Sequence, residues 1–208
     1  MIDLHTHSFL SDGQLCPAEL VQRAKKKGYR ALAITDHVDS SNLDLIVPQI
    51  VKFCRENAHL NSDIRVIPGV ELTHLLPSLI NKLARKAREK GAKLVIVHGE
   101  TIVEPVPKGT NAAALGADID ILAHPGLISE EEVKIAKERG IYLEISSRKG
   151  HSLTNGWVAR LATKWGTKLI LNTDAHGAED LITEETARKI LQGAGLSYRE
   201  IESVMRNS

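Results

Sequence analysis

Short apolar segments alternate with amphipathic segments along nearly the whole 208-residue chain. Seven runs rich in Val, Ile and Leu have the length and composition of buried β-strands. In chain order they read MIDLH, ALAITDH, IRVIPGVEL, KLVIVHG, IDILAHP, IYLEISS and KLILNTDAH. The segments between them carry apolar residues at helical spacing. The chain is therefore predicted to be an α/β protein in which βα units repeat around a parallel sheet.

The segments between the apolar runs are predicted to form helices. The clearest are residues 18–28, which follow Pro17, and residues 43–58, 77–91 and 130–140. Several end in a Lys/Arg-Gly pair, where the cation favours the helix C-terminus and glycine allows a left-handed cap. Two further helices are predicted in the tail, TEETARKIL and GLSYREIESVM, and Ser197 and Glu200 have the spacing of a capping box in the second.

Composition indicates one domain, residues 1–208, without a linker. Apolar residues make up 42% and charged residues 25%, as in a globular protein with a core. A net charge of +1, with basic residues scattered along the chain, makes nucleic acid an unlikely partner. Cys16 and Cys54 are too few for a disulfide framework. The first predicted strand leaves no room for a secretory leader before it. No apolar run is long enough to span a bilayer. We therefore expect a cytoplasmic protein that does not bind membranes.

Polar residues that can bind a metal follow nearly every predicted strand. They are His5 and His7 after the first strand, His37 after the second, Glu71 after the third, His98 after the fourth, His124 after the fifth, and Asp174 and His176 after the seventh. In a parallel barrel the carboxyl ends of all strands meet at one mouth, whereas an open sheet gathers its site at one switch point. The distribution over many strands favours a (β/α) barrel with outer helices.

The spacing of these residues indicates a metal site. Side chains alternate along a strand, so His5 and His7 point the same way. Asp12, in the SDG turn, is a further candidate ligand or a turn residue. A single histidine after a strand is usually structural. Many polar side chains packed at one mouth, however, cost folding free energy unless bound cations compensate that cost. Imidazoles and carboxylates without thiolates favour Zn²⁺, Mn²⁺ or iron, and nine candidates exceed what one ion takes, so two or three ions are expected.

The motifs DLHTHSFLSDG, ITDH, GVEL, VHGE, AHPG and NTDAH occur in this order at strand ends. Together they resemble the PHP (polymerase and histidinol phosphatase) family of metal-dependent phosphoesterases. The resemblance implies a distorted seven-stranded TIM-like barrel and a trinuclear site. It places one ion on His5, His7, Glu71 and Asp174, a second on Glu71, His98 and His124, and a third on Asp12, His37 and His176.

The loop after the sixth predicted strand differs from the others, because it offers Arg148, Lys149 and His151 in place of a matching ligand. We expect Arg148 to hold phosphate oxygens in a bidentate fork, with Lys149 and His151 as weaker substrate contacts. A solvated basic loop is the alternative. His74 is a further candidate for substrate contact, or else a surface residue. The residues expected to take part in catalysis are Glu71, Asp174, His176 and Arg148.

Two other polar residues have less certain roles. Glu144, inside the sixth strand, is expected either to hydrogen-bond a ligating histidine or to satisfy neighbours in the barrel. His59, near the end of the second predicted helix, is interpreted as structural, since a cation there favours the helix dipole.

Clustered divalent ions activate water and stabilise charge on phosphate oxygens. With the resemblance, this predicts hydrolysis of a small phosphomonoester, as in histidinol phosphatases. A PHP-type 3′–5′ exonuclease or phosphodiesterase acting on nucleic acid or nucleotides is the alternative, but an aromatic content of 3% gives few surfaces for base stacking. A non-catalytic metal-stabilised barrel would be expected to have lost ligands. An amidohydrolase barrel normally has eight strands and a carboxylated lysine after the fourth.

Overall fold

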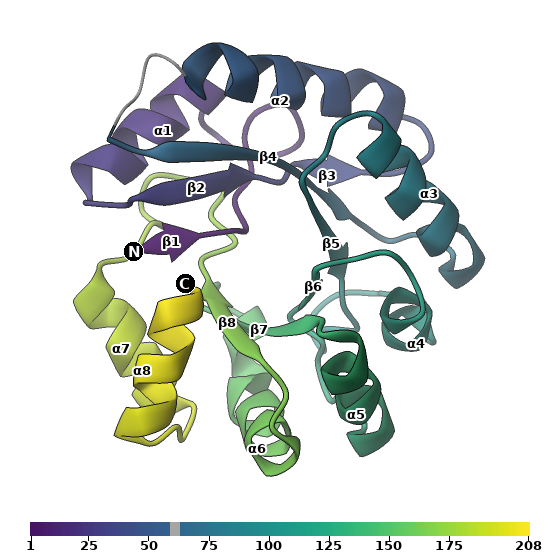
Figure 1. The fold of residues 1–208 in the computed structure, drawn as a ribbon, viewed down its shortest axis with the longest axis vertical. Coiled ribbons are helices and arrows are strands. Elements are labelled where there is room, and N and C mark those ends of the chain that lie inside the picture. Colours follow the sequence, from purple (N-terminus) through teal and green to yellow (C-terminus); the bar gives the residue numbers. More distant parts are fainter. Residues whose placement is uncertain (59–62) are drawn as a thin grey trace.

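The computed structural model describes residues 1–58 and 63–208, so His59 lies outside the described residues. A ring of parallel strands is surrounded by helices (Figure 1). The strands are β1 Ile2–Asp3, β2 Ala31–Ile34, β3 His37–Val38, β4 Arg65–Leu72, β5 Leu94–His98, β6 Ile121–Ala123, β7 Tyr142–Ser146 and β8 Leu169–Asn172. Their order around the ring is β1-β2-β4-β5-β6-β7-β8, and β3 pairs with β4. The predicted α/β barrel of seven parallel strand positions is confirmed.

The second predicted strand is divided into β2 and β3, and Asp36 lies at the break. Its carboxylate accepts hydrogen bonds from the backbone N–H and hydroxyl of Ser8, at 2.8 and 2.7 Å, and from those of Ser11, at 3.1 and 2.7 Å. These bonds fix the loop after β1, which carries Asp12. The break in the strand therefore helps to position the site.

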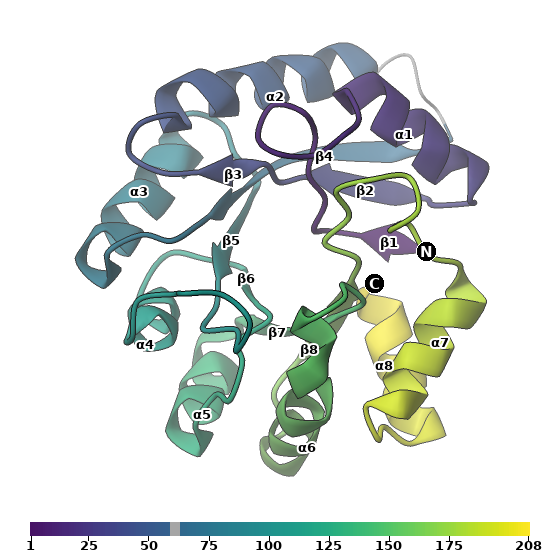
Figure 2. The ribbon, with the colours of Figure 1, turned by 180° about the vertical axis from the view of Figure 1, so that it is seen from behind.

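The ring closes between β1 and β8 mainly through polar contacts. Thr6 and Ala175 form an isolated parallel bridge beyond the two strands. Asp3 accepts hydrogen bonds from the Thr173 backbone N–H at 3.2 Å and from its hydroxyl at 2.5 Å. The loop after β1 lies beside the loop after β8 (Figure 2), where the N–H of Gln14 donates to the carbonyl of His176 at 2.7 Å. Residues from opposite ends of the chain thus meet at one mouth.

The helices are α1 Pro17–Lys26, α2 Leu43–Ala58, α3 Pro77–Glu89, α4 Thr110–Leu115, α5 Glu130–Arg139, α6 Asn155–Trp165, α7 Glu184–Gly193 and α8 Tyr198–Asn207, with a 3₁₀ turn η1 at His151–Thr154. The predicted helices are present, and their glycine stops lie just outside the helical residues. Gly91 and Gly140 have φ of 104° and 71°, which side chains with a Cβ rarely adopt. The predicted capping box of Ser197 and Glu200 is confirmed.

Two apolar clusters support the barrel. The larger one lies between the strands and the outer helices. The smaller one consists of buried residues from the strands alone, namely Ala33, Leu94, Ile96, Ile121, Ala123 and Ile170. Because alternate residues of a barrel strand point inward, this cluster fills the barrel interior. It forms an apolar floor beneath the polar residues at the strand ends.

No helix in the described ranges combines the length and the apolar character needed to cross a membrane.

Candidate metal centre

His5 and His7 reach the barrel mouth from the first strand position because Thr6, between them, points into the neighbouring strand. The Thr6 hydroxyl donates to the carbonyl of Ala33 at 2.6 Å, and its N–H donates to the Thr35 hydroxyl at 3.0 Å. The two imidazoles therefore share a face, with ring centroids 5.1 Å apart. This is the alternation expected from the sequence.

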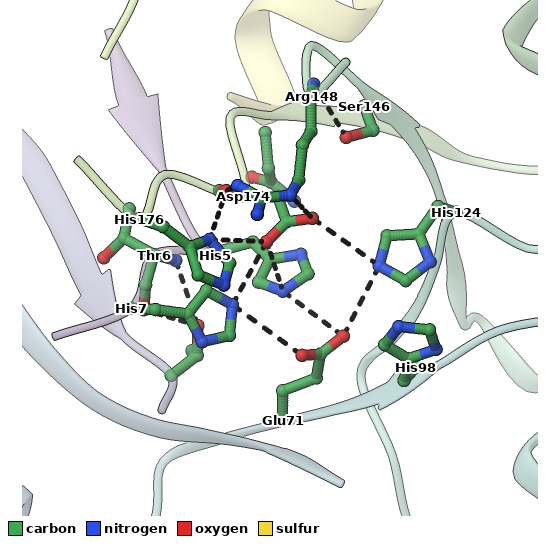
Figure 3. Close-up of polar contacts among 12 residues, drawn as sticks. His5, Thr6, His7, Glu71, His98, His124, Ser146, Arg148, Asp174 and His176 are labelled. Atoms are coloured by element: carbon green, nitrogen blue, oxygen red, sulfur yellow. Dashed lines mark hydrogen bonds and ion pairs between the residues drawn. The ribbon is translucent and has the colours of Figure 1, made fainter. Parts of the chain in front are cut away.

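Glu71, at the end of β4, lies at the centre of the site and is fully buried (Figure 3). Its Oε1 is 3.4 Å from His5 Nε2 and 3.5 Å from His124 Nε2. Its Oε2 is 2.7 Å from His37 Nδ1 and 3.7 Å from His7 Nε2. Burial raises the pKa of Glu71, but the neighbouring His5 and His37 lower it well below its ordinary value. The carboxylate is thus ionised between four imidazoles.

Asp174 lies opposite Glu71 across the same imidazoles. Its Oδ1 is 3.2 Å from His7 Nε2 and 3.7 Å from His5 Nε2, and its Oδ2 is 3.8 Å from His124 Nε2. Burial raises the pKa of Asp174 above its ordinary value, although His5 and His124 oppose that rise. Two carboxylates from β4 and from the end of β8 therefore enclose one group of imidazoles.

Backbone strain is concentrated at this mouth. Among the described residues, the non-glycine positions with positive φ are His74 at 51°, His124 at 26° and Asp174 at 53°. All three take part in the ion pairs of the cluster. Such conformations are costly and are commonly found at functional sites.

Asp12, His37 and His176 form a second part of the site. Asp12 Oδ1 is 3.5 Å from His37 Nε2 and 3.3 Å from His176 Nε2. One ligand atom from each of these three residues and from His7 lies within 4.8 Å of the others. Burial raises the pKa of Asp12, but the hydrogen bond from His176 and the charge of His37 lower it overall. The SDG turn thus brings its carboxylate to the histidines.

His98 and His124 form a third part, together with His151 and Glu104. The three histidines are buried, and one ring nitrogen of each lies within 4.8 Å of the others. Glu104 Oε2 is 3.0 Å from His98 Nε2, and Oε1 is 3.3 Å from His151 Nε2. The hydrogen bond from His98 lowers the pKa of Glu104 to about 2. Sequence analysis missed Glu104, whose only signal is an acidic side chain in the loop after the VHGE motif.

Hydrogen bonds behind several imidazoles determine which nitrogen faces the mouth. His5 Nδ1 donates to Glu144 at 2.8 Å, His98 Nδ1 to the Gly99 carbonyl at 3.1 Å, and His176 Nδ1 to the Asp174 carbonyl at 2.9 Å. In the neutral ring this leaves the Nε2 lone pair free, the usual arrangement of a metal-ligating histidine. Of the two roles expected for Glu144, the contact with His5 is present.

Buried polar atoms without partners test whether the site fits a metal. Within the described residues these atoms include His5 Nε2, both ring nitrogens of His7, Glu71 Oε1 and His124 Nδ1. Leaving a buried polar group unsatisfied costs about 1–3 kcal/mol. Five such atoms in one group of imidazoles and a carboxylate fit divalent cations, which would satisfy them together.

A cavity of about 340 Å³ opens at this mouth, and Arg148 lines it. Nη1 of Arg148 donates a hydrogen bond to the Asp174 carbonyl at 3.0 Å, and Nε of Arg148 lies 3.6 Å from Asp174 Oδ2. His74 also lines the cavity, 3.4 Å from Glu104. Lys149 is exposed and does not line it. The structure thus brings Arg148, His74 and His151 to the mouth but not Lys149.

These features define a parallel α/β barrel with a histidine- and carboxylate-lined site, able to hold several ions, at its C-terminal mouth. A model of the PHP domain matches residues 3–101. An uncharacterized protein of Methanocaldococcus jannaschii is 50% identical over 204 residues, which cover 98% of this chain and 94% of that protein. The chain belongs to the PHP domain family, as the order of its motifs predicted.

More distant relatives carry names that point to phosphate chemistry. A protein of Thermoanaerobacter sp. named "Probable phosphatase" is 25% identical over 226 residues, which cover 95% of this chain and 87% of that protein. The DNA polymerase/3′-5′ exonuclease PolX of Bacillus subtilis is 26% identical over 209 residues, which cover 90% of this chain but 36% of that protein.

Solved structures share the fold. The histidinol phosphate phosphatase of Lactococcus lactis, complexed with zinc, L-histidinol and phosphate, superposes with a TM-score of 0.65 at 17% identity and covers 94% of each chain. A chain of an archaeal ribonuclease P bound to mature tRNA gives a TM-score of 0.72 at 16% identity, covering 99% of this chain and 87% of that one.

Proposed function

We propose that this protein is a metal-dependent phosphoesterase that hydrolyses a small phosphomonoester. The observation that carries the proposal is the position of Glu71 and Asp174 among imidazoles with unpartnered buried nitrogens at the mouth of the barrel. The phosphatase names among the relatives, and the histidinol phosphate phosphatase among the structures, support phosphate as the reacting group.

Nine residues would hold two or three ions of zinc, manganese or iron. They are His5, His7, Asp12, His37, Glu71, His98, His124, Asp174 and His176. Bound ions would supply an activated water and positive charge for the phosphate oxygens. Glu71 and Asp174 would set the spacing of the site, since each lies near several imidazoles. The Asp174 carbonyl keeps His176 in the tautomer that presents Nε2.

Arg148 would bind the phosphate of the substrate. Its guanidinium is held at the mouth by the Asp174 carbonyl and remains 30% exposed, so it has donors left for an anion. His74 is proposed as a weaker substrate contact, since it lines the same cavity. The position of Lys149 does not support a direct role.

A panel of substrates tests the proposal. Purified protein supplied with Zn²⁺, Mn²⁺ or Fe²⁺ is incubated with phosphomonoesters, including L-histidinol phosphate, beside a phosphodiester and single-stranded DNA. We expect metal-dependent release of phosphate from at least one monoester and none after chelation. Absence of turnover from every ester with each metal, in protein shown to bind metal, would disprove the proposal.

The match to the B. subtilis polymerase and exonuclease favours a second candidate, cleavage of nucleic acid from its 3′ end. The same ions and the same Arg148 would suit a phosphodiester. In the DNA arm of the panel, shortening from the 3′ end without monoester turnover would select this candidate.

A further inference from the structure

Glu104 approaches the metal centre from the loop after β5, and the fold holds it there. The Glu100 carboxylate accepts hydrogen bonds from the N–H groups of Gly109 and Asn111, at 3.0 and 2.9 Å. These bonds draw the two ends of the loop together. Glu104, in the segment between them, lines the cavity at the barrel mouth.

His151 reaches the same place from η1, after β7. It is only 4% exposed, and its ring stacks on His124 with centroids 4.0 Å apart and planes inclined by 16°. Its Nδ1 is hydrogen-bonded to the Thr101 hydroxyl at 2.9 Å, which directs Nε2 toward Glu104. A buried ring stacked on a candidate ligand is poorly placed for contact with an exposed substrate.

Glu104 faces imidazole nitrogens on two sides. Its oxygens lie 3.0 Å from His98 Nε2 and 3.3 Å from His151 Nε2. His98 Nδ1 donates to the Gly99 carbonyl, so a neutral His98 presents a lone pair to the carboxylate. Without metal, a proton on His98 Nε2 satisfies the carboxylate, and a divalent cation in its place would compensate the carboxylate and the neighbouring imidazoles at once. His124 adds a buried Nδ1 without a partner.

We infer that Glu104 and His151 are metal ligands, and that they join Glu71, His98 and His124 around the second ion. Imidazoles and carboxylates suit Zn²⁺, which takes four and at times five such ligands. The inference rests on the metal centre of the proposed function, and it adds two ligands from loops that the family motifs do not include.

Metal binding tests this inference independently of turnover. The full chain and its Glu104→Gln and His151→Asn variants are titrated with Zn²⁺, bound metal is counted by mass spectrometry after dialysis, and Co²⁺ absorption reports coordination number. Asparagine keeps a polar atom near the Thr101 hydroxyl while removing Nε2. Each variant is expected to bind one of the Zn²⁺ ions at least about tenfold more weakly and the other ions with unchanged affinity.

Two control variants separate this site from its surroundings. His74→Asn tests the competing set, because ligand atoms of His74, His98 and Glu104 also lie within 4.8 Å of one another, and asparagine tolerates the positive φ of this position. Glu138→Gln removes an exposed carboxylate on α5. Both are expected to bind metal like the unaltered protein. Circular dichroism of the metal-free variants checks that each one folds.

The outcomes distinguish this inference from the proposed function. If Glu104→Gln and His151→Asn bind as many ions as tightly as the unaltered protein, the inference is wrong whether or not the protein hydrolyses phosphate esters. Loss of an ion in His74→Asn but not in His151→Asn would also overturn it. If the unaltered protein binds metal as proposed but hydrolyses no ester, only the proposed function fails.

Discussion

Nδ1 of His5 donates a hydrogen bond to Oε1 of Glu144 at 2.8 Å, and both side chains are buried. The contact joins the first strand position to β7, and β8 lies between them in the ring. The other oxygen of Glu144 accepts from the backbone N–H of His124 at 3.1 Å. The Glu144 carboxylate thus orients the ring of His5 at the centre of the site and holds the strained backbone of His124.

Glu144→Gln is expected to weaken metal binding by about 10- to 100-fold, the usual effect of losing a group that orients a ligating histidine. Burial raises the pKa of Glu144, but the charge of His5 and its hydrogen bond lower that pKa to about 2, so the native group is an anion at neutral pH. The neutral amide keeps the volume and removes the charge. Zinc titration with a competing chelator measures the change, and unaltered affinity would remove Glu144 from this role.

His5→Ala and Asp174→Ala are each expected to lose bound metal and activity together, because both residues are assigned to one ion. His5 Nε2 and Asp174 Oδ1 lie 3.7 Å apart, and both residues are neighbours of His7. Metal content per chain is measured beside turnover of the best monoester. Retention of all bound metal by either variant would contradict the shared assignment.

Arg148→Ala is expected to raise KM for monoesters while leaving metal content unchanged. Loss of a hydrogen bond between charged groups costs about 1.5–3 kcal/mol, which corresponds to an increase of about ten- to a hundredfold. Arg148→Lys keeps the charge without the bidentate fork and is expected to recover part of the loss. Steady-state kinetics of the two variants at matched metal occupancy make the comparison, and unchanged KM in both would exclude phosphate binding by Arg148.

Periodicity predicted the parallel βα units, and the polar residues after many of the strands favoured the barrel that brings them to one mouth. The apolar runs identified the strands, and the rule that parallel strands end at one face brought His5 and Asp174 together, although 169 positions separate them in the sequence. The alternation of His5 and His7 also held, because Thr6 has a hydrogen-bonding partner on the other face. These features depend on regular local structure, which sequence patterns describe well.

Loop paths could not be predicted in the same way. Glu104 reaches the site from a loop whose two ends Glu100 joins through two backbone N–H groups, a contact without a periodic signal. Lys149 and His151 are two residues apart, yet the turn into η1 exposes the first and buries the second. The break between β2 and β3 depends likewise on Asp36 binding a loop more than twenty residues earlier.

Metal affinity is expected to rise with pH across the neutral range, because protons compete with the ions for imidazole nitrogens. Burial lowers the pKa of His37 and His98, but Glu71 beside the first and Glu104 beside the second raise each above the ordinary value. Without metal both rings therefore keep protons to a higher pH than free histidine, and binding must displace those protons. Calorimetric Zn²⁺ titrations in buffers of different ionisation enthalpy, between about pH 6 and 8 around the ordinary histidine pKa, measure this release. Affinity that stays constant or falls with rising pH would show that these imidazoles do not bind the ions.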